Sequence, residues 1–142
     1  MTDGGIYYSG RGEELKKFNT KDGHGIVKIQ KMGIQVGIIT GRVSKIVATR
    51  AEELEITEVH QNQHNKIATY NEIKKRLKLT DSQIAYVGDD EPDLATLRIA
   101  GFSAAPADAS PIVLRAVDFV CSREGGNGAV REVIDLLLGA RS

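Results

Sequence analysis

The chain has 142 residues, of which 41% are hydrophobic and 27% are charged. That length and composition suit one folded domain with its own hydrophobic core. The 19 basic and 19 acidic side chains balance, so the net charge gives no reason to expect a nucleic-acid or membrane partner. A single cysteine, Cys121, excludes a disulfide within one chain. We expect neither a membrane span nor a signal peptide, and therefore a cytoplasmic protein.

The first part of the chain predicts a β-hairpin over residues 4–19, followed by a helix. Two β-prone runs lie on either side of Ser9–Gly12, whose residues favour a turn. Gly23 and Gly25 are expected to break the chain before a short helix begins. Gly33 has the right position to end this helix, because glycine readily adopts the left-handed conformation found after a helix C-terminus.

Strands and helices alternate along the rest of the chain. Short apolar runs predict buried strands, and apolar residues at helical spacing predict helices. Further helices are expected to begin near Pro92 and to carry Val130–Leu138. This order predicts an α/β fold, a Rossmann-like parallel sheet with helices on both faces, in one domain over residues 1–142. The expected strands are 34–39, 58–60, 84–87, 102–105 and 119–121, and the other expected helices are 44–54, 65–79 and 112–116.

Polar side chains follow three of these strands. Thr40 comes after the first, Lys66 begins the helix after the second, and Asp89 and Asp90 come after the third. Because ligands bind beyond the carboxyl ends of strands in open parallel sheets, we expect these residues to meet in one crevice. Carboxylates suit Mg²⁺, whereas a hydroxyl and a lysine suit phosphate oxygens. The pattern therefore predicts a phosphoryl-transfer site.

Each of these signals also has an ordinary structural interpretation. An Asp-Asp pair before a helix is often an N-cap, and Thr40-Gly41 alone is common turn chemistry. Lys66 alone is more often a solvated helix residue. We interpret His60 and His64 as loop histidines rather than as a metal-binding pair. The prediction of a site therefore depends on Thr40, Lys66 and the Asp89–Asp90 pair taken together.

Taken in order, these residues resemble the motifs of the haloacid dehalogenase superfamily. Ile39–Arg42 resembles its second motif, Lys66 its third, and Gly88–Asp90 with Asp93 its fourth. Other stretches resemble one family within it, the capless 3-deoxy-D-manno-octulosonate 8-phosphate (KDO 8-phosphate) phosphatases. These stretches are Thr2–Tyr8, Phe18–Gly25, Gln63–Lys66 and Gly125–Leu138.

The resemblance implies an Mg²⁺-dependent phosphatase that acts on a sugar-acid phosphate in lipopolysaccharide precursor synthesis. It also implies a homotetramer, assembled through the hairpin of residues 4–19. By position, Thr40 is expected to bind the transferring phosphoryl group and Lys66 to neutralise its charge. Asp89 is expected to bind the metal, and Asp93 to support the metal site or hold Lys66. The substrate contacts implied are Lys21, Asp22, Gly41 and Arg42.

One part of the family pattern is absent from the sequence. Family members carry an Asp-x-Asp motif at the end of a first, central strand. Its first aspartate attacks phosphorus, and its second acts as general acid and base. Here Met1 stands after the expected position of both. We therefore expect a sheet without its central strand and a chain that is inactive as written. Either the sequence is incomplete, or subunits pair differently to fill the gap.

Two alternatives stay open. The absent nucleophile beside an intact hairpin is also compatible with a non-catalytic oligomeric scaffold or a pseudo-phosphatase. The substrate is also open, because a nononate or neuraminate 9-phosphate has similar chemistry to KDO 8-phosphate. Relatives often have a polar tail after the last helix, and here little follows Leu138 except a few residues ending at Ser142.

Overall fold

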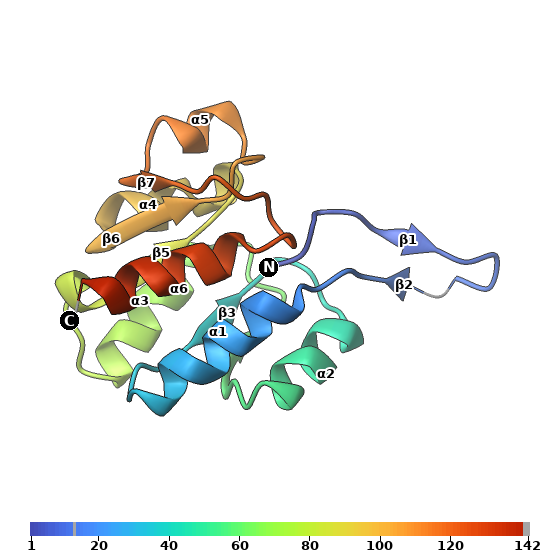
Figure 1. The fold of residues 1–142 in the computed structure, drawn as a ribbon, viewed down its shortest axis with the longest axis horizontal. Helices are drawn as coiled ribbons and strands as arrows, with labels where there is room; N and C mark the ends of the chain where they lie inside the picture. The colour runs from blue at the N-terminus through green and yellow to red at the C-terminus, as the bar shows by residue number, and fades with distance from the viewer. Residues whose placement is uncertain (13, 141–142) are drawn as a thin grey trace.

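The computed structural model describes residues 1–12 and 14–140. Figure 1 shows an α/β body from which one hairpin projects. The hairpin comes first in the chain, and the remaining strands alternate with helices. In order, the elements are β1 Tyr7–Tyr8, β2 Glu14–Leu15, α1 Thr20–Lys31, β3 Gly37–Ile39, α2 Lys45–Glu53, β4 Glu58–His60, α3 Lys66–Arg76, η1 Asp81–Gln83, β5 Ala85–Val87, η2 Glu91–Asp93, α4 Leu94–Ile99, β6 Phe102–Ala105, α5 Pro111–Leu114, β7 Phe119–Val120 and α6 Ala129–Gly139.

The predicted hairpin is confirmed, with shorter strands than expected. β1 and β2 pair antiparallel, with Tyr7 opposite Leu15. The amide of Gly12 donates to the carbonyl of Ser9 at 3.0 Å and closes the turn. The hairpin extends away from the rest of the protein (Figure 1), and its Tyr8 side chain is 66% exposed. It therefore presents large apolar groups outside the core.

The expectation that Gly23 and Gly25 precede the first helix is wrong, because both lie inside α1. The helix begins earlier, where the Asn19 side chain accepts a hydrogen bond from the Lys21 amide and caps it. A Cβ atom at Gly25 would stand 2.8 Å from Cδ of Arg131 on α6, and one at Gly23 would meet the Arg50 guanidinium. The two glycines thus allow the side chains of Arg131 and Arg50 to approach α1 closely, in spite of the low helix propensity of glycine. Gly33 follows the helix as predicted, with a positive φ.

The parallel α/β architecture is confirmed, but the strands form two separate parallel sheets. β3 pairs with β4, and β5, β6 and β7 form a second sheet in that order. Among the described residues, no strand joins β3 to β5. A divided sheet is what a Rossmann-like fold without its central strand is expected to show.

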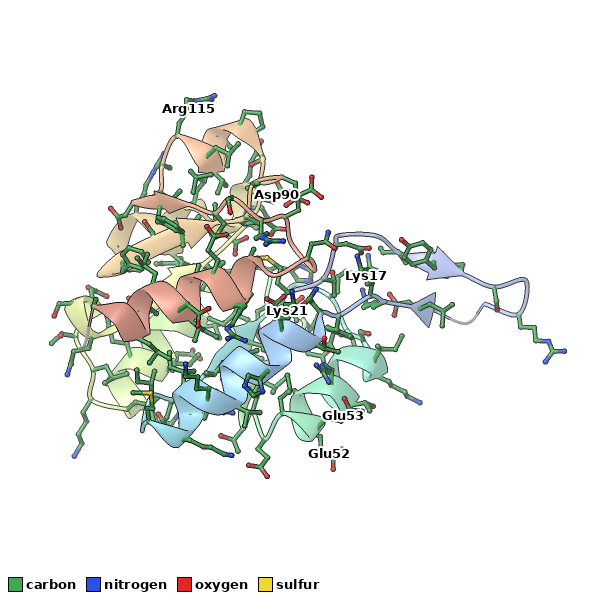
Figure 2. The ribbon with its side chains drawn as sticks, viewed as in Figure 1. Lys17, Lys21, Glu52, Glu53, Asp90 and Arg115 are labelled. Atoms are coloured by element: carbon green, nitrogen blue, oxygen red, sulfur yellow. The ribbon has the colours of Figure 1, made fainter. Side chains whose placement is uncertain are left out.

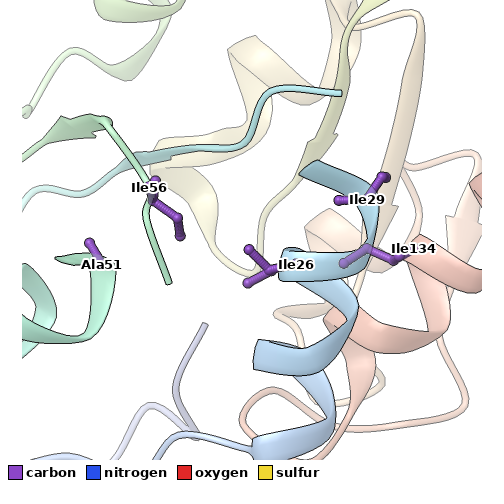
Figure 3. Packing of buried hydrophobic residues seen from close by; sticks show 5 residues of the cluster. All are labelled: Ile26, Ile29, Ala51, Ile56 and Ile134. Carbon is purple, nitrogen blue, oxygen red and sulfur yellow. The ribbon is translucent and has the colours of Figure 1, made fainter. Parts of the chain in front are cut away.

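Helices cover both faces of the strands. α1 and α6 lie side by side in front of the strands in Figure 1, whereas α3 and α4 contact each other behind them. Figure 3 shows the buried cluster on the front side, to which α1, α2 and α6 all contribute. No helix in residues 1–12 or 14–140 is long and apolar enough to cross a membrane.

Most other boundaries agree with the predictions. The helix expected over 44–54 is α2, which Ser44 caps, since its hydroxyl accepts from the amide of Val47. The helix expected to run to Leu79 ends at Arg76, because the chain turns through a positive φ at Lys78. The helix near Pro92 starts with the 3₁₀ turn η2 before α4 begins.

Candidate active site

A cavity of about 990 Å³ lies between β3 and β5. Folded cores rarely contain voids much larger than a water molecule, so this one is a major feature of the fold. Six of the predicted site residues line its walls: Asp22 in α1, Thr40 and Arg42 after β3, Lys66 at the start of α3, Asp89 after β5, and Asp93 in η2. The structure therefore brings Thr40, Lys66 and Asp89, which follow three of the predicted strands, together in one cavity.

Asp93 organises this end of the cavity. The carboxyl group is buried, with the residue only 3% exposed. Its Oδ1 accepts from the Lys66 ammonium at 2.8 Å and from the Tyr86 hydroxyl at 2.8 Å. Its Oδ2 accepts from the amides of Asp89 at 3.2 Å and Asp90 at 3.4 Å. One carboxylate thus fixes both the lysine and the loop that carries Asp89.

Gly88 allows Asp93 to take this position. A Cβ atom at Gly88 would lie 2.5 Å from Cβ and 2.7 Å from Cγ of Asp93. Atoms that close overlap, so only glycine fits here while the Asp93 carboxylate stays under the loop. The glycine of the Gly-Asp-Asp motif therefore has a steric role.

Asp89 is the residue best placed to hold a metal ion. Its side chain is open to the cavity. Desolvation raises the pKa of this carboxyl group, and the neighbouring charge of Asp93 raises it further, while Lys66 opposes both. A carboxylate short of positive charge suits Mg²⁺. In residues 1–12 and 14–140, no three His, Cys, Asp or Glu side chains gather to hold a metal, so Asp89 fits as one ligand among several.

Thr40, Gly41 and Arg42 form the loop beyond β3. Thr40 is held by backbone bonds: its amide donates to the His60 carbonyl at 2.9 Å, and its carbonyl accepts from the Gln63 amide at 2.9 Å. The Thr40 hydroxyl accepts from the Arg42 amide at 3.3 Å. The Arg42 guanidinium lies 3.5 Å from the Glu14 carboxylate at the base of the hairpin. This loop is thereby fixed on one side to β4 and on the other to the hairpin.

Lys21 and Asp22, predicted as loop contacts for the substrate, lie in the first turn of α1 instead. Lys21 is exposed and does not line the cavity; Figure 2 shows it at the start of the helix. Asp22 is buried and does line the cavity. Its Oδ1 accepts from the Arg131 amide of α6 at 2.9 Å, whereas its Oδ2 has no partner. Asp22 therefore has both a helix-joining contact and a free oxygen.

The amino group of Met1 lies near the carboxylates of Asp22 and Asp89. Burial lowers the pKa of this amino group, while the charges of Asp22 and Asp89 work in the opposite direction. Met1 also lines the cavity. The chain thus passes from the Thr40–Asp89 end of the cavity into the hairpin.

Sequence reasoning missed two residues of the site. Tyr86 was assigned only to a buried strand, yet its hydroxyl reaches Asp93, and burial followed by the Asp93 charge raises its pKa. Lys16 lies in the predicted hairpin, yet it lines the cavity with a side chain that is 6% exposed, and its ammonium lies 3.2 Å from the Glu14 carboxylate. The only sequence feature that could have indicated a role for Tyr86 in the site was its hydroxyl group, a polar group inside an apolar strand.

Comparison with known proteins supports the geometry. The family model described as haloacid dehalogenase-like hydrolase matches residues 43–134, a range that contains Lys66, Asp89 and Asp93. The chain belongs to the haloacid dehalogenase-like hydrolase family. Phosphatases of this family use Mg²⁺, in agreement with the open carboxylate of Asp89.

Individual members of the family align with almost the whole length of this chain. The 3-deoxy-D-manno-octulosonate 8-phosphate phosphatase KdsC of Escherichia coli K12 is 44% identical over 141 residues, which are 99% of this chain and 75% of that protein. The crystal structure of the Yersinia pestis phosphatase of the same name gives a TM-score of 0.97 at 45% identity, covering 99% of this chain and 76% of that one. The Moraxella catarrhalis phosphatase, solved with magnesium, phosphate and KDO, gives 0.95 at 40% identity, covering 98% and 80%. This haloacid dehalogenase-like hydrolase therefore has the fold of known phosphatases.

Proposed function

We propose that the chain forms the phosphate- and magnesium-binding part of a phosphatase site for a sugar-acid phosphate, with 3-deoxy-D-manno-octulosonate 8-phosphate as the substrate. The observation that carries the proposal is the contact between Lys66 and Asp93 beside the open carboxylate of Asp89. Relatives named for this activity are 44% identical over nearly the whole chain, which supports the choice of substrate. On this proposal the protein acts in lipopolysaccharide precursor synthesis.

Each residue has a defined role in this proposal. The ammonium of Lys66, held in place by Asp93, pairs with a phosphoryl oxygen and offsets its charge. The hydroxyl of Thr40 donates to a second phosphoryl oxygen. Asp89 binds Mg²⁺, which when present neutralises negative charge on the phosphoryl group. Gly41 and Arg42, in the loop beyond β3, contact the substrate in this proposal, with Arg42 paired to its carboxylate.

The described residues leave the attacking group unassigned. Asp93 is already bound by Lys66 and Tyr86, one oxygen of Asp22 is bound by Arg131, and Asp89 is the metal ligand. The family pattern places the nucleophile and the acid–base group on an Asp-x-Asp strand. We therefore expect the chain as written to release no phosphate, and turnover to require that pair of carboxylates in the cavity.

An assay of phosphate release tests this function. The chain as written is compared with a version that carries, directly before Met1, an apolar strand ending in Asp-x-Asp. With Mg²⁺ and KDO 8-phosphate, the extended protein should release phosphate, and Asp89→Asn or removal of Mg²⁺ should abolish the release. A folded extended protein without turnover on any sugar-acid phosphate would favour the scaffold or pseudo-phosphatase. A panel that includes nononate and neuraminate 9-phosphates separates the possible substrates.

The hairpin supports a proposal about assembly. We propose a cytoplasmic homotetramer of single-domain subunits, in which the hairpins of residues 4–19 meet. Tyr7, Tyr8 and Leu15 are more than half exposed in one chain, which is unusual for large apolar residues. Lys16 and Glu14 connect this hairpin to the cavity, so assembly through it would also fix one wall of the site.

A further inference from the structure

Asn127 and Gly128 lie in the turn that leads into α6, and neither of them lines the cavity. Of the asparagines in the chain, only Asn127 is followed by glycine. The side-chain carbonyl carbon of an asparagine can be attacked by the backbone nitrogen of the next residue. Glycine permits this attack best, because it has no side chain in the way and the widest backbone freedom. The pair is therefore a candidate for a chemical change within the chain itself.

The Asn127 side chain is partly exposed, and its carbonyl oxygen is bound by a lysine. The Lys17 ammonium donates to Oδ1 of Asn127 at 2.5 Å, and Figure 2 shows Lys17 close to where the hairpin meets the body of the protein. An ammonium group at this oxygen stabilises the negative charge that develops there when a nucleophile attacks Cγ. Nδ2, the group that would leave, has only a long bond of 3.5 Å to the Gly125 carbonyl. The contacts of Asn127 therefore favour attack at Cγ.

The backbone amide of Gly128 is the nucleophile that follows Asn127. Among the residues that the structure describes, this amide donates to no acceptor, so no hydrogen bond must break before it reacts. Gly128 is the N-cap of α6, a helix of 11 residues whose N-terminal end favours negative charge and so helps the nitrogen lose its proton. A Cβ atom at Gly128 would have only Cγ of Arg123 within 4 Å, at 3.9 Å, which leaves open space for a ring to form.

We propose that Asn127 is a self-modification site, at which the folded protein converts this asparagine into aspartate or isoaspartate with the assistance of Lys17. The Gly128 nitrogen loses its proton and forms a bond to Cγ of Asn127. The Cγ–Nδ2 bond breaks, and Nδ2 takes up a proton and leaves as ammonia. Water then opens the cyclic imide: attack at Cγ gives aspartate, and attack at the backbone carbonyl carbon gives isoaspartate. The reaction consumes only water and needs no oxidant or cofactor.

The modification changes the contact between the hairpin and the start of α6. It adds one negative charge to a chain whose formal net charge is zero. The new carboxylate forms where the Lys17 ammonium already donates, so a hydrogen bond to a neutral amide becomes an ion pair. Lys17 follows β2 and Asn127 precedes α6. The converted protein therefore holds the base of the hairpin more firmly against its body.

One contact in the turn opposes the reaction. The amide of Asn127 donates to the carbonyl of Glu124 at 3.1 Å, which closes the turn and restricts the backbone at Asn127. A restricted backbone slows ring closure, because Cγ must approach the next amide nitrogen. The Lys17 contact and the unbound Gly128 amide act in the opposite direction. The rate of conversion in the folded protein, with and without Lys17, measures which effect is larger.

Incubation of the full chain at neutral pH for several weeks tests this inference without any need for phosphatase activity. Anion exchange separates the converted protein by its added charge, and peptide mapping by mass spectrometry locates the change. Labelling with an isoaspartyl methyltransferase identifies the isoaspartate. We expect conversion at Asn127 and none at Asn71, which is exposed but lies inside α3 and is followed by Glu72. The rate should rise with pH, because the Gly128 nitrogen must lose a proton.

Three variants separate the role of Lys17 from the general reactivity of an Asn-Gly pair. Lys17→Gln removes the ammonium group and should slow the conversion roughly two- to fivefold, the factor that corresponds to one exposed charged contact. Lys28→Gln, at an exposed position on α1 away from the turn, should leave the rate unchanged. Asn127→Gln should abolish the conversion, because glutamine would have to close a larger ring. Circular dichroism checks that each variant is folded.

Two outcomes would overturn the inference. An Asn127 that stays unchanged in the folded protein would show that the turn prevents ring closure, and conversion of the same residue in a urea-unfolded sample would confirm that cause. A Lys17→Gln variant that converts as fast as the parent protein, or faster, would show that the ammonium group does not assist the reaction. Neither result depends on the substrate or on the phosphatase site.

Discussion

The Lys66 ammonium lies 2.8 Å from Oδ1 of Asp93, although the two residues follow strands of different sheets. Lys66 begins the helix that follows β4, and Asp93 lies in the turn that follows β5. Both side chains are largely buried, so neither charge is well solvated. The pair therefore fixes the position of the Lys66 ammonium and connects the two halves of the protein across the cavity.

Replacement of Asp93 by Asn should destabilise the protein strongly. The change keeps the shape of the side chain but leaves Lys66 without a counter-charge in a buried place, which costs about 3 kcal/mol or more. Urea unfolding followed by circular dichroism measures the loss. Asp90→Asn is the matched control, because Asp90 is exposed and Asn serves almost equally well as an N-cap. Similar losses for the two variants would contradict the role given to Asp93.

Replacement of Gly88 by Ala should displace the Asp93 carboxylate. The added methyl group would overlap Cβ and Cγ of Asp93, so either the loop or the carboxylate must move. We expect a loss of roughly 1–3 kcal/mol in the free energy of unfolding. Gly10→Ala in the hairpin turn, where nothing lies within 4 Å of the new atom, should change stability little. A neutral Gly88→Ala variant would show that the motif glycine has no steric role.

Glu58 should make the stability depend on pH in the acid range. A hydrogen bond from Arg76, and then one from His60, lower the pKa of Glu58 from 4.5 to about 2 in the folded protein. A lowered pKa means that the stabilisation is complete above pH 4.5 and is lost as the pH falls toward 2. Because Arg76 is half exposed and screened by solvent, Glu58→Gln should cost only about 1 kcal/mol at pH 7.

Thermal unfolding of the Glu58→Gln variant at several pH values measures this effect. The difference from the parent protein should shrink steadily below pH 4.5. Glu52→Gln is the control, since Glu52 points to solvent from α2 (Figure 2) and such changes stay within about 0.5 kcal/mol. A constant difference between pH 7 and pH 3 would argue against an ion pair at Glu58.

Polar substitutions on the hairpin should weaken self-association. Tyr7, Tyr8 and Leu15 expose large apolar groups on a hairpin that projects from the protein. Replacement of Tyr8 and Leu15 by Ser removes much of that surface without touching the cavity. Sedimentation should show smaller assemblies than for the parent chain. Val43→Ser, at another highly exposed apolar position, should leave the assembly unchanged; equal effects would place the interface elsewhere.

Most of the fold followed from local sequence patterns. Short apolar runs marked β3, β5 and β6, and Ser44 and Asn65 each cap the helix that follows. α1 was the main failure. Its glycines disfavour a helix locally, yet both lie inside α1, where the side chains of Arg131 and Arg50 approach them from other elements. A contact across more than a hundred positions in the chain leaves no trace in a local pattern.

The candidate site was recognisable for a similar reason. Thr40, Lys66 and Asp89 each follow a strand, and parallel strands place such residues at one edge. The contacts that hold them were not recognisable, because Tyr86 reaches Asp93 from inside a strand and Lys16 reaches the cavity from the hairpin. The prediction put Lys21 in a loop because it put the start of α1 too late in the chain.

The division of the strands into two sheets also affects how the protein unfolds. In the part of the chain that the structure describes, no ladder bonds join β3 to β5, and the two halves are connected by side-chain contacts such as Lys66–Asp93 and by the packing of α1 on α6. Regions connected in this way open separately more easily than regions that share a continuous sheet. The β3–β4 half and the β5–β7 half should therefore open as separate units in native-state hydrogen exchange, and the contact between Lys66 and Asp93 opposes that opening.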